Sequence, residues 1–268
     1  MTKRILSGKA AIITGAARGI GKATALCLAE RGCGLVLSGR EDNTLEKVAI
    51  EVTERGGQAV CVAADLRAAG TPDLLVQKAH DSFNTLDILV NAAGFAQPKP
   101  LLELELGVWQ NFLDLHLTAT FLCAQAAARD MVAGRKKGRI VNLSSIAASM
   151  AMYGNGPYGA VKAAVSSLTR TFAIELAPHG ISVNAVAPGP VDTEGFRAAN
   201  DEEKYRQRSR SIPFNRLADP AEVAELIAFL VSPGAEYITG QTLTIDGGAA
   251  AVGCYSFETY KRTERTGC

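Results

Sequence analysis

The feature that most constrains the fold of this chain is the alternation of short apolar segments with longer segments of helical periodicity. The apolar segments are rich in β-branched residues and are continuous rather than alternating, which is typical of parallel strands covered on both faces. The segments that we predict as strands are 10–14, 35–38, 59–63, 86–91, 139–143, 182–187 and 242–245.

Between these strands lie segments whose apolar residues recur at helical spacing. This alternation predicts an α/β fold, a Rossmann-type doubly wound parallel sheet of about seven strands with helices on both faces. No linker rich in Pro, Gly or Ser divides the chain, so we expect a single domain over residues 1–268. The segments predicted as helices are 19–31, 43–55, 71–83, 107–133, 157–177 and 220–232.

Two segments interrupt this rhythm. Residues 190–219 are polar and charged and stand where the connection between a strand and a helix is usually short, so we predict a substrate loop or lid there. Residues 249–268 form a C-terminal tail that carries Tyr255, Phe257 and Tyr260. Three interpretations of this tail are open: it packs on a partner, it covers the pocket, or it is disordered.

Composition narrows the functional classes. The formal net charge of +1 gives no overall field that favours nucleic acid or an anionic membrane. The apolar run at 10–14 is too short for a signal sequence or a membrane span. We therefore expect a cytoplasmic protein that binds neither nucleic acid nor a membrane. The six cysteines contain no C-x-x-C pair and the three histidines form no ligand pattern, so we expect buried thiols and no metal site.

Glycines are concentrated directly after the first predicted strand, in the sequence TGAARGIG at residues 14–21. At the carboxyl edge of a parallel sheet, a tight turn before a helix presents free N–H groups and the positive end of the helix dipole to a pyrophosphate. Gly15 would permit the turn, Gly19 the close approach of phosphates, and Gly21 the close contact of helix and sheet. The alternative is a turn that serves packing alone, but the flanking strand and helix favour the phosphate site.

The spacing of these glycines differs from both the G-x-G-x-x-G fingerprint and a Walker loop. It resembles the T-G-x-x-x-G-x-G motif of the short-chain dehydrogenase/reductase family, and the resemblance extends from Gly8 to Gly248. Within that family the chain is similar to 3-oxoacyl-carrier-protein reductases and related carbonyl reductases. The resemblance implies an oxidoreductase that interconverts a ketone and a secondary alcohol with a nicotinamide cofactor.

The end of the second predicted strand bears on the choice between NAD(H) and NADP(H). An acidic residue there would bind the ribose hydroxyls and repel a 2′-phosphate, but Gly39 occupies the position where NAD-using relatives carry Asp. Arg40 follows at once and Arg18 lies in the glycine turn, and two guanidiniums suit a dianionic phosphate. We therefore predict NADP(H). The alternative is that both arginines are only solvated surface charges.

The resemblance also implies which other residues contact the cofactor. Asp65 matches the position whose carboxylate meets the adenine. The sequence at 91–94 resembles the family's N-N-A-G with Ala92 for the second Asn, and Pro188-Gly189 resembles the loop beside the nicotinamide. The full set of expected cofactor residues is Gly15, Arg18, Gly19, Ile20, Gly21, Arg40, Asp65, Leu66, Asn91, Ala92, Gly94, Tyr158, Lys162, Pro188, Gly189, Val191 and Thr193.

Tyr158 and Lys162 stand four residues apart in a predicted helix and therefore on one face. A phenol with its ordinary pKa near 10 is a poor acid–base catalyst at neutral pH, and a neighbouring ammonium stabilises the phenolate. This spacing alone is a weak signal, but Ser145 lies thirteen residues before Tyr158 at the end of a strand, an interval that matches the family's catalytic pair. Ser144 is the neighbouring alternative. The resemblance implies that Ser145 binds the substrate oxygen and Tyr158 moves the proton.

One family position departs from the pattern. Residues 109–118 align with the helix that normally bears a catalytic Asn, and His116 stands where the Asn is expected. In the family this Asn helps to hold a water that joins the lysine to solvent, and a histidine can also hydrogen-bond a water. We hypothesise that His116 takes over this catalytic role. The alternative is that it only fills the helix.

The substrate and the assembly are less constrained. The connection between residues 145 and 158 is mostly apolar, which predicts a largely apolar carbonyl or alcohol substrate unless these side chains belong to the core. A cofactor-binding regulator or scaffold with weak chemistry is the alternative function, and only His116 supports it. A sugar-nucleotide epimerase would need a different first turn and a larger substrate domain.

Family members are usually tetramers built through two long helices, here 107–133 and 157–177, so we expect a homotetramer.

Overall fold

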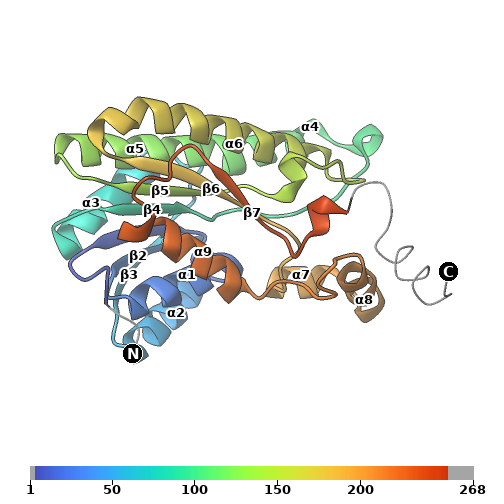
Figure 1. Cartoon of the computed structure of the whole chain (residues 1–268), viewed down its shortest axis with the longest axis horizontal. Coiled ribbons are helices and arrows are strands. Elements are labelled where there is room, and N and C mark those ends of the chain that lie inside the picture. Colours follow the sequence, from blue (N-terminus) through green and yellow to red (C-terminus); the bar gives the residue numbers. More distant parts are fainter. Residues whose placement is uncertain (1–3, 253–268) are drawn as a thin grey trace.

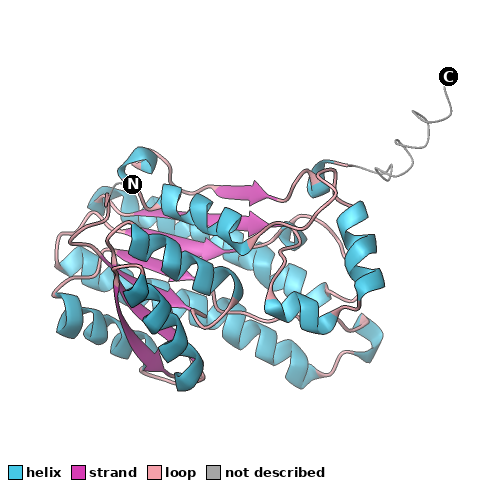
Figure 2. Ribbon diagram, turned by 90° about the horizontal axis from the view of Figure 1, so that it is seen from below, coloured by secondary structure: helices cyan, strands magenta, loops and turns pink. Residues whose placement is uncertain are grey.

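A computed structural model describes residues 4–252 of the chain, in which seven strands form one parallel sheet. The strand order is β3-β2-β1-β4-β5-β6-β7, and all strands run in one direction across the twisted sheet (Figure 2). The strands are β1 Ala10–Thr14, β2 Gly34–Gly39, β3 Gln58–Ala63, β4 Ile88–Asn91, β5 Arg139–Leu143, β6 Ser182–Pro188 and β7 Thr242–Ile245. The predicted Rossmann-type doubly wound sheet is confirmed, with strand bounds within two residues of those expected.

Helices cover both faces of this sheet (Figure 1). One apolar cluster joins the sheet to α1, α2 and α9, and a second joins its other face to α3, α5 and α6. The central strands are buried along their full length because both of their faces are covered. The helices are α1 Gly19–Glu30, α2 Asp42–Glu54, α3 Thr71–Phe83, α4 Leu106–Phe112, α5 Ala119–Ala133, α6 Gly156–Leu176, α7 Glu194–Ala199, α8 Glu202–Arg210 and α9 Pro220–Leu230.

The sequence missed one irregularity in the long helix expected over 107–133. The chain is helical there, but a π-helical turn at Leu113–Thr118 separates α4 from α5. His116 lies inside this wider turn. Such turns arise where one extra residue is accommodated within a helix, and they are frequent at functional sites. Apolar periodicity does not reveal them because the pattern resumes after the turn.

The segment expected as a polar loop at 190–219 contains the helices α7 and α8, which the sequence also missed. Both helices lack an apolar stripe, so periodicity could not find them, and each begins at a capping side chain. The Thr193 hydroxyl accepts from the Phe196 N–H and the Asp201 carboxylate from the Lys204 N–H. The two ends of the segment meet where Val191 bridges Ala218, so residues 190–219 form a closed excursion, hereafter the lid.

The sheet places the lid and the glycine turn at the same edge. β1 and β4 are neighbours at the centre of the sheet, where the strand order reverses, and ligands of such sheets bind at the carboxyl ends near this point. The lid helices lie beyond these carboxyl ends (Figure 1).

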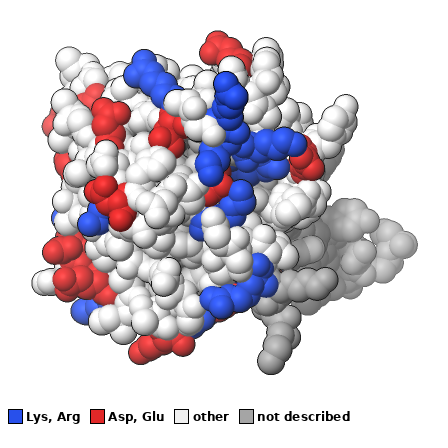
Figure 3. Space-filling model, turned by 90° about the vertical axis from the view of Figure 1, so that its left-hand side faces the viewer, with Lys and Arg blue, Asp and Glu red and all other residues white. Residues whose placement is uncertain are grey.

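The opposite edge, where the strands begin, carries charged side chains of both signs, with Lys and Arg gathered on one part of the face (Figure 3). Next to β1 and β5, Lys9 pairs with Asp87 at 2.7 Å and Lys137 with Glu236 at 3.7 Å. These ion pairs serve the structure of that edge rather than a site. None of the described helices is long and apolar enough to cross a membrane.

Candidate active site and cofactor site

The turn between β1 and α1 requires its glycines for steric reasons. Gly15 has φ +68, and a Cβ there would lie 2.7 Å from the Ala93 Cα in the loop after β4. A Cβ on Gly21 would lie 2.2 Å from the Gly15 carbonyl oxygen, so the first turn of α1 packs directly on the glycine turn. Side chains at either position would force the turn open, away from the start of the helix.

The start of α1 binds an anion that the protein itself supplies. The Gly19 N–H donates a hydrogen bond of 3.1 Å to the Glu194 carboxylate of the lid. The cap residue Arg18 contributes no side-chain cap to α1, so the free N–H groups and the helix dipole act on this distant carboxylate. A cofactor pyrophosphate therefore fits the chemistry of this position, and Gly19 and Ile20 are the residues that would hold it.

Thr14 is a site residue that the sequence reasoning left without a role. Its hydroxyl accepts hydrogen bonds from the Ala92 N–H at 3.1 Å and the Ala93 N–H at 3.2 Å. This contact joins the end of β1 to the loop after β4, on which Ala92 and Gly94 stand. The family motif begins with this Thr, so the sequence could have singled out Thr14, but it could not show that Thr14 contacts Ala92 and Ala93.

The residues expected around the adenosine follow the ends of three strands: Arg18 lies in the turn after β1, Arg40 follows β2 and Asp65 follows β3. Arg18 and Arg40 are exposed, as a phosphate-binding guanidinium at the rim of a site must be. Asp65 is held by Arg67, whose side chain pairs with it at 2.6 Å and whose N–H donates at 2.9 Å. These hydrogen bonds, with a smaller effect of Arg40, lower the pKa of Asp65 to about 2. Arg67 was missed because only the fold shows that it turns back onto Asp65.

The Asn91 side chain takes part in a buried hydrogen-bond network. Its side-chain amide donates to Asn142 at 3.0 Å and to the Thr120 carbonyl at 3.3 Å, and Asn142 in turn donates to Thr169. The side chain is therefore committed to a buried chain of hydrogen bonds between β4, β5 and α6. The Asn91 amide nitrogen is therefore not free to donate to a cofactor.

The two serines at the end of β5 have different partners. The Ser144 hydroxyl lies 2.7 Å from the Ser166 hydroxyl and donates to the Lys162 carbonyl, so it fixes β5 to α6. The Ser145 hydroxyl accepts from the Ala147 N–H at 3.2 Å, and its own hydrogen can serve Tyr158 or a substrate oxygen. The geometry thus leaves Ser145, not Ser144, available to a substrate oxygen.

Lys162 and Tyr158 come together on α6. The Lys162 Nζ lies 5.7 Å from the centroid of the Tyr158 ring and donates to the Leu143 carbonyl at 2.6 Å. Lys162 is only 5% exposed, and burial lowers the pKa of its ammonium to about 8. Burial also raises the pKa of the Tyr158 phenol, and the nearby Ser145 hydroxyl partly offsets this increase by hydrogen bonding.

His116 lies beside this pair but is not solvated. Its side chain is 1% exposed and meets the Tyr158 ring edge-on at a centroid distance of 5.6 Å. The Phe95 N–H donates to its Nε2 at 3.2 Å, whereas its buried Nδ1 has no hydrogen-bond partner among the described residues. Burial, and to a lesser degree the Lys162 charge, lowers the pKa of His116 to about 3, so the imidazole is neutral at physiological pH. Its role as a water holder stays a prediction.

The expected residues of the loop after β6 line the base of the lid. Gly189 packs closely enough on Asp246 that a Cβ would lie 2.8 Å from the Asp246 Cβ. Pro188 and Val191 are buried, and the Thr193 Cγ2 would lie 3.1 Å from a Cβ on Gly19. Thr193 therefore stands against the glycine turn, and its contact with the cofactor stays a prediction.

Apolar side chains surround the catalytic pair. The rings of Phe95 and Phe112 lie tilted with their centroids 4.5 Å apart, and both pack on His116. Farther out, the Lys99 N–H donates to the Gly154 carbonyl at 2.8 Å, so the loops after β4 and β5 are joined at the rim. Large apolar side chains exposed on or near these loops are Leu101, Leu102, Leu106, Met150 and Tyr153. Met150 and Tyr153 thus lie at the surface, whereas Ile146 belongs to the core.

The chain is similar to known oxidoreductases over almost its full length. The family described as enoyl-(acyl carrier protein) reductase matches residues 15–250. A 3-oxoacyl-[acyl-carrier-protein] reductase of Synechocystis sp. is 42% identical over 91% of this chain and 97% of its own. A cis-4-hydroxycyclohexanecarboxylate dehydrogenase of Sinomonas cyclohexanicum is 40% identical over the same shares. A short-chain type dehydrogenase/reductase from Mycobacterium marinum superposes with a TM-score of 0.88 at 34% identity, covering 94% of this chain and 98% of its own.

Proposed function

Because the chain belongs to the short-chain dehydrogenase/reductase family, we propose that it is an NADP(H)-dependent oxidoreductase that interconverts a ketone and a secondary alcohol. One observation carries this proposal: the Lys162 Nζ lies 5.7 Å from the Tyr158 ring centroid, on the helix that packs against the 3-10 turn Ile146–Ala148, which Ser145 caps. Ser145 follows β5 at the carboxyl edge of the sheet, the same edge at which the glycine turn follows β1.

The catalytic groups divide the work of one proton transfer. In reduction, the Ser145 hydroxyl donates a hydrogen bond to the substrate carbonyl oxygen, and Tyr158 gives its proton to that oxygen as it becomes an alkoxide. The ammonium of Lys162, whose Nζ lies 5.7 Å from the Tyr158 ring centroid, stabilises the phenolate that remains. When bound, the nicotinamide supplies the hydride in this direction and accepts it in the other.

The preference for NADP(H) rests on charge at the end of β2. Gly39 provides no carboxylate for the ribose hydroxyls, and Arg40 and Arg18 are exposed at the rim. The Asp65 carboxylate nearby is paired with Arg67, which reduces its repulsion of a 2′-phosphate. Arg40→Ala should lower kcat/KM with NADPH by about 10- to 100-fold and leave kcat/KM with NADH unchanged. Equal losses with both cofactors would show that Arg40 does not read the phosphate.

The surroundings of the pair favour a largely apolar substrate. Phe95 is half-buried beside the His116 ring, which meets Tyr158 edge-on, and no basic cluster marks a charged substrate group among the residues described around it. We also propose that the enzyme acts in the cytoplasm, because the four cysteines of the described segment are thiols rather than disulfides.

A panel of ketones tests the proposal. NADPH oxidation is followed with cyclic, aryl and 3-oxoacyl ketones, and Tyr158→Phe is the matched control because it removes the proton donor and keeps the ring. We expect turnover with at least one apolar ketone, and a loss of about 10²- to 10⁴-fold in Tyr158→Phe. Tight NADPH binding without turnover of any ketone would instead support a cofactor-binding regulator.

A further inference from the structure

The Glu194 carboxylate occupies the place at the start of α1 that a phosphate of the cofactor would take. The hydrogen bond from Gly19 N–H to Glu194 Oε2 spans 175 positions of sequence, so it is a contact of the lid with the glycine turn and not a local cap. Thr193 adds to this contact, since its Cγ2 lies against Gly19. The lid is thus seated on the residues that hold a pyrophosphate.

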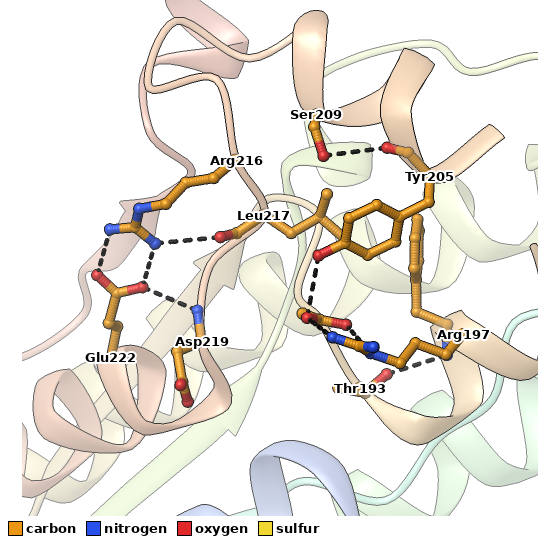
Figure 4. Close-up of polar contacts among 10 residues, drawn as sticks. Thr193, Arg197, Tyr205, Ser209, Arg216, Leu217, Asp219 and Glu222 are labelled. Atoms are coloured by element: carbon orange, nitrogen blue, oxygen red, sulfur yellow. Dashed lines mark hydrogen bonds and ion pairs between the residues drawn. The ribbon is translucent and has the colours of Figure 1, made fainter. Parts of the chain in front are cut away.

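Side-chain hydrogen bonds hold the two lid helices together. The Asp192 carboxylate accepts from Arg197 Nε at 2.6 Å and Nη2 at 2.5 Å, and from the Tyr205 hydroxyl at 3.0 Å (Figure 4). These bonds tie α7 to α8. The far end of the lid is fixed separately, where Arg216 forms two hydrogen bonds of 2.6 and 2.7 Å with Glu222 of α9 (Figure 4). A displacement of Glu194 is therefore passed to both lid helices.

We propose that Glu194 is a tethered competitor of the cofactor pyrophosphate and thereby sets the affinity of the enzyme for its cofactor. The inference rests on the proposed function, since it requires a dinucleotide at this turn. The Gly19 N–H can serve only one strong acceptor, and a carboxylate beside a pyrophosphate is repelled. Cofactor binding must therefore expel Glu194 and release the lid from α1, and the lost contact reduces the net affinity.

Equilibrium binding of NADP⁺ to the full chain, measured by calorimetry, tests this competition. Glu194→Gln removes the charge from the competing group, so NADP⁺ should bind about 3- to 10-fold more tightly. The matched control is Glu203→Gln, which removes an equal charge from the exposed face of α8, where Glu203 contacts only Gln207 among the polar partners described. The control should change the dissociation constant by less than about twofold.

The outcomes distinguish a failure of the Glu194 competition from a failure of the proposed function. If Glu194→Gln binds NADP⁺ no more tightly than Glu203→Gln, the competition is overturned while the proposed function stands. If wild type binds neither NADP⁺ nor NAD⁺, the proposed function itself fails.

Hydrogen exchange provides a readout that does not depend on the dinucleotide. Inorganic pyrophosphate added to wild type should accelerate exchange in the peptide that covers α7, because the anion takes the Gly19 N–H and frees Glu194. In Glu194→Ala the same peptide should exchange rapidly already, and pyrophosphate should add nothing. Identical exchange in both proteins, with and without pyrophosphate, would contradict the proposal.

Discussion

At the scale of single residues, the site concentrates groups whose charged forms are unfavourable where they stand. Among the described residues, the Lys162 ammonium has one hydrogen-bond partner, the Leu143 carbonyl, to compensate for its removal from water. His116 is held neutral by burial between Phe112, Phe95 and Tyr158. Such groups cost folding stability and supply chemistry, so their substitution should change stability and activity in opposite directions.

Lys162→Met provides a test of this opposition. The folded pKa of about 8 lies below the ordinary value of 10.5, so between these pH values the unfolded chain binds a proton that the folded chain does not. The free energy of unfolding of wild type therefore gains up to about 3 kcal/mol across this window, and the variant lacks that gain. Urea unfolding at pH 7 and pH 10 should show the advantage of Lys162→Met shrinking as pH rises, while its kcat is reduced at both. A stability difference that is the same at both pH values would contradict this.

His116 makes a separate prediction about the pH dependence of the rate. Its pKa of about 3 leaves the imidazole uncharged from pH 6 to 9, so His116→Asn should keep the shape of the pH–rate profile. His116→Ala should lower kcat about tenfold at every pH, because the Phe95 N–H loses its acceptor and Tyr158 its ring contact. Turnover of the Ala variant equal to that of wild type at every pH would remove any catalytic role. A titration that appears in the pH–rate profile of wild type but not in that of His116→Asn would show that the imidazole carries a proton.

At the scale of elements, the turn between β1 and α1 is a unit whose backbone positions the cofactor. Gly21→Ala would place a Cβ 2.2 Å from the Gly15 carbonyl oxygen, so the turn must shift away from α1. We expect the NADP⁺ dissociation constant to rise about 10- to 100-fold.

The matched control for this turn is Gly107→Ala in α4, where an added Cβ meets nothing within 4 Å. It should leave NADP⁺ binding unchanged and raise the free energy of unfolding by about 0.5–1 kcal/mol, because alanine suits a helix better than glycine. Equal effects of the two substitutions on binding would mean that the turn does not act through its close packing.

At the scale of the whole molecule, α5 and α6 present an outer face with a hollow of about 500 Å³. Phe121 and Leu168 line it, and both helices form the outermost layer over their side of the sheet (Figure 1). The expected homotetramer would bury this face. Sedimentation velocity should give a tetramer for wild type and a smaller species for Leu168→Asp, because a carboxylate in an apolar interface is costly. The control is Leu102→Asp, at an exposed position before α4, which should leave the sedimenting mass of the assembly unchanged. A wild-type protein that sediments as a monomer would contradict the predicted tetramer.

Much of the fold could be predicted because its signals are local. Continuous apolar runs identified every strand of the sheet, and helical periodicity identified the helices that pack on it. The lid helices α7 and α8 were not predicted, because they are defined by capping at Thr193 and Asp201 and not by an apolar stripe. The tail expected at 249–268, with Tyr255, Phe257 and Tyr260, lies outside the described residues from 253 onward.

The sequence by itself determined the order of the strands along the chain, the glycine turn and the spacing of Ser145, Tyr158 and Lys162, because these are properties of neighbouring residues. Only the tertiary structure decided that Glu194 meets Gly19, that Arg67 neutralises Asp65, and how deeply Lys162 and His116 are buried. The physical reason is that desolvation and ion pairing depend on what other elements bring to a side chain, and the spacing of residues along the chain carries no record of it.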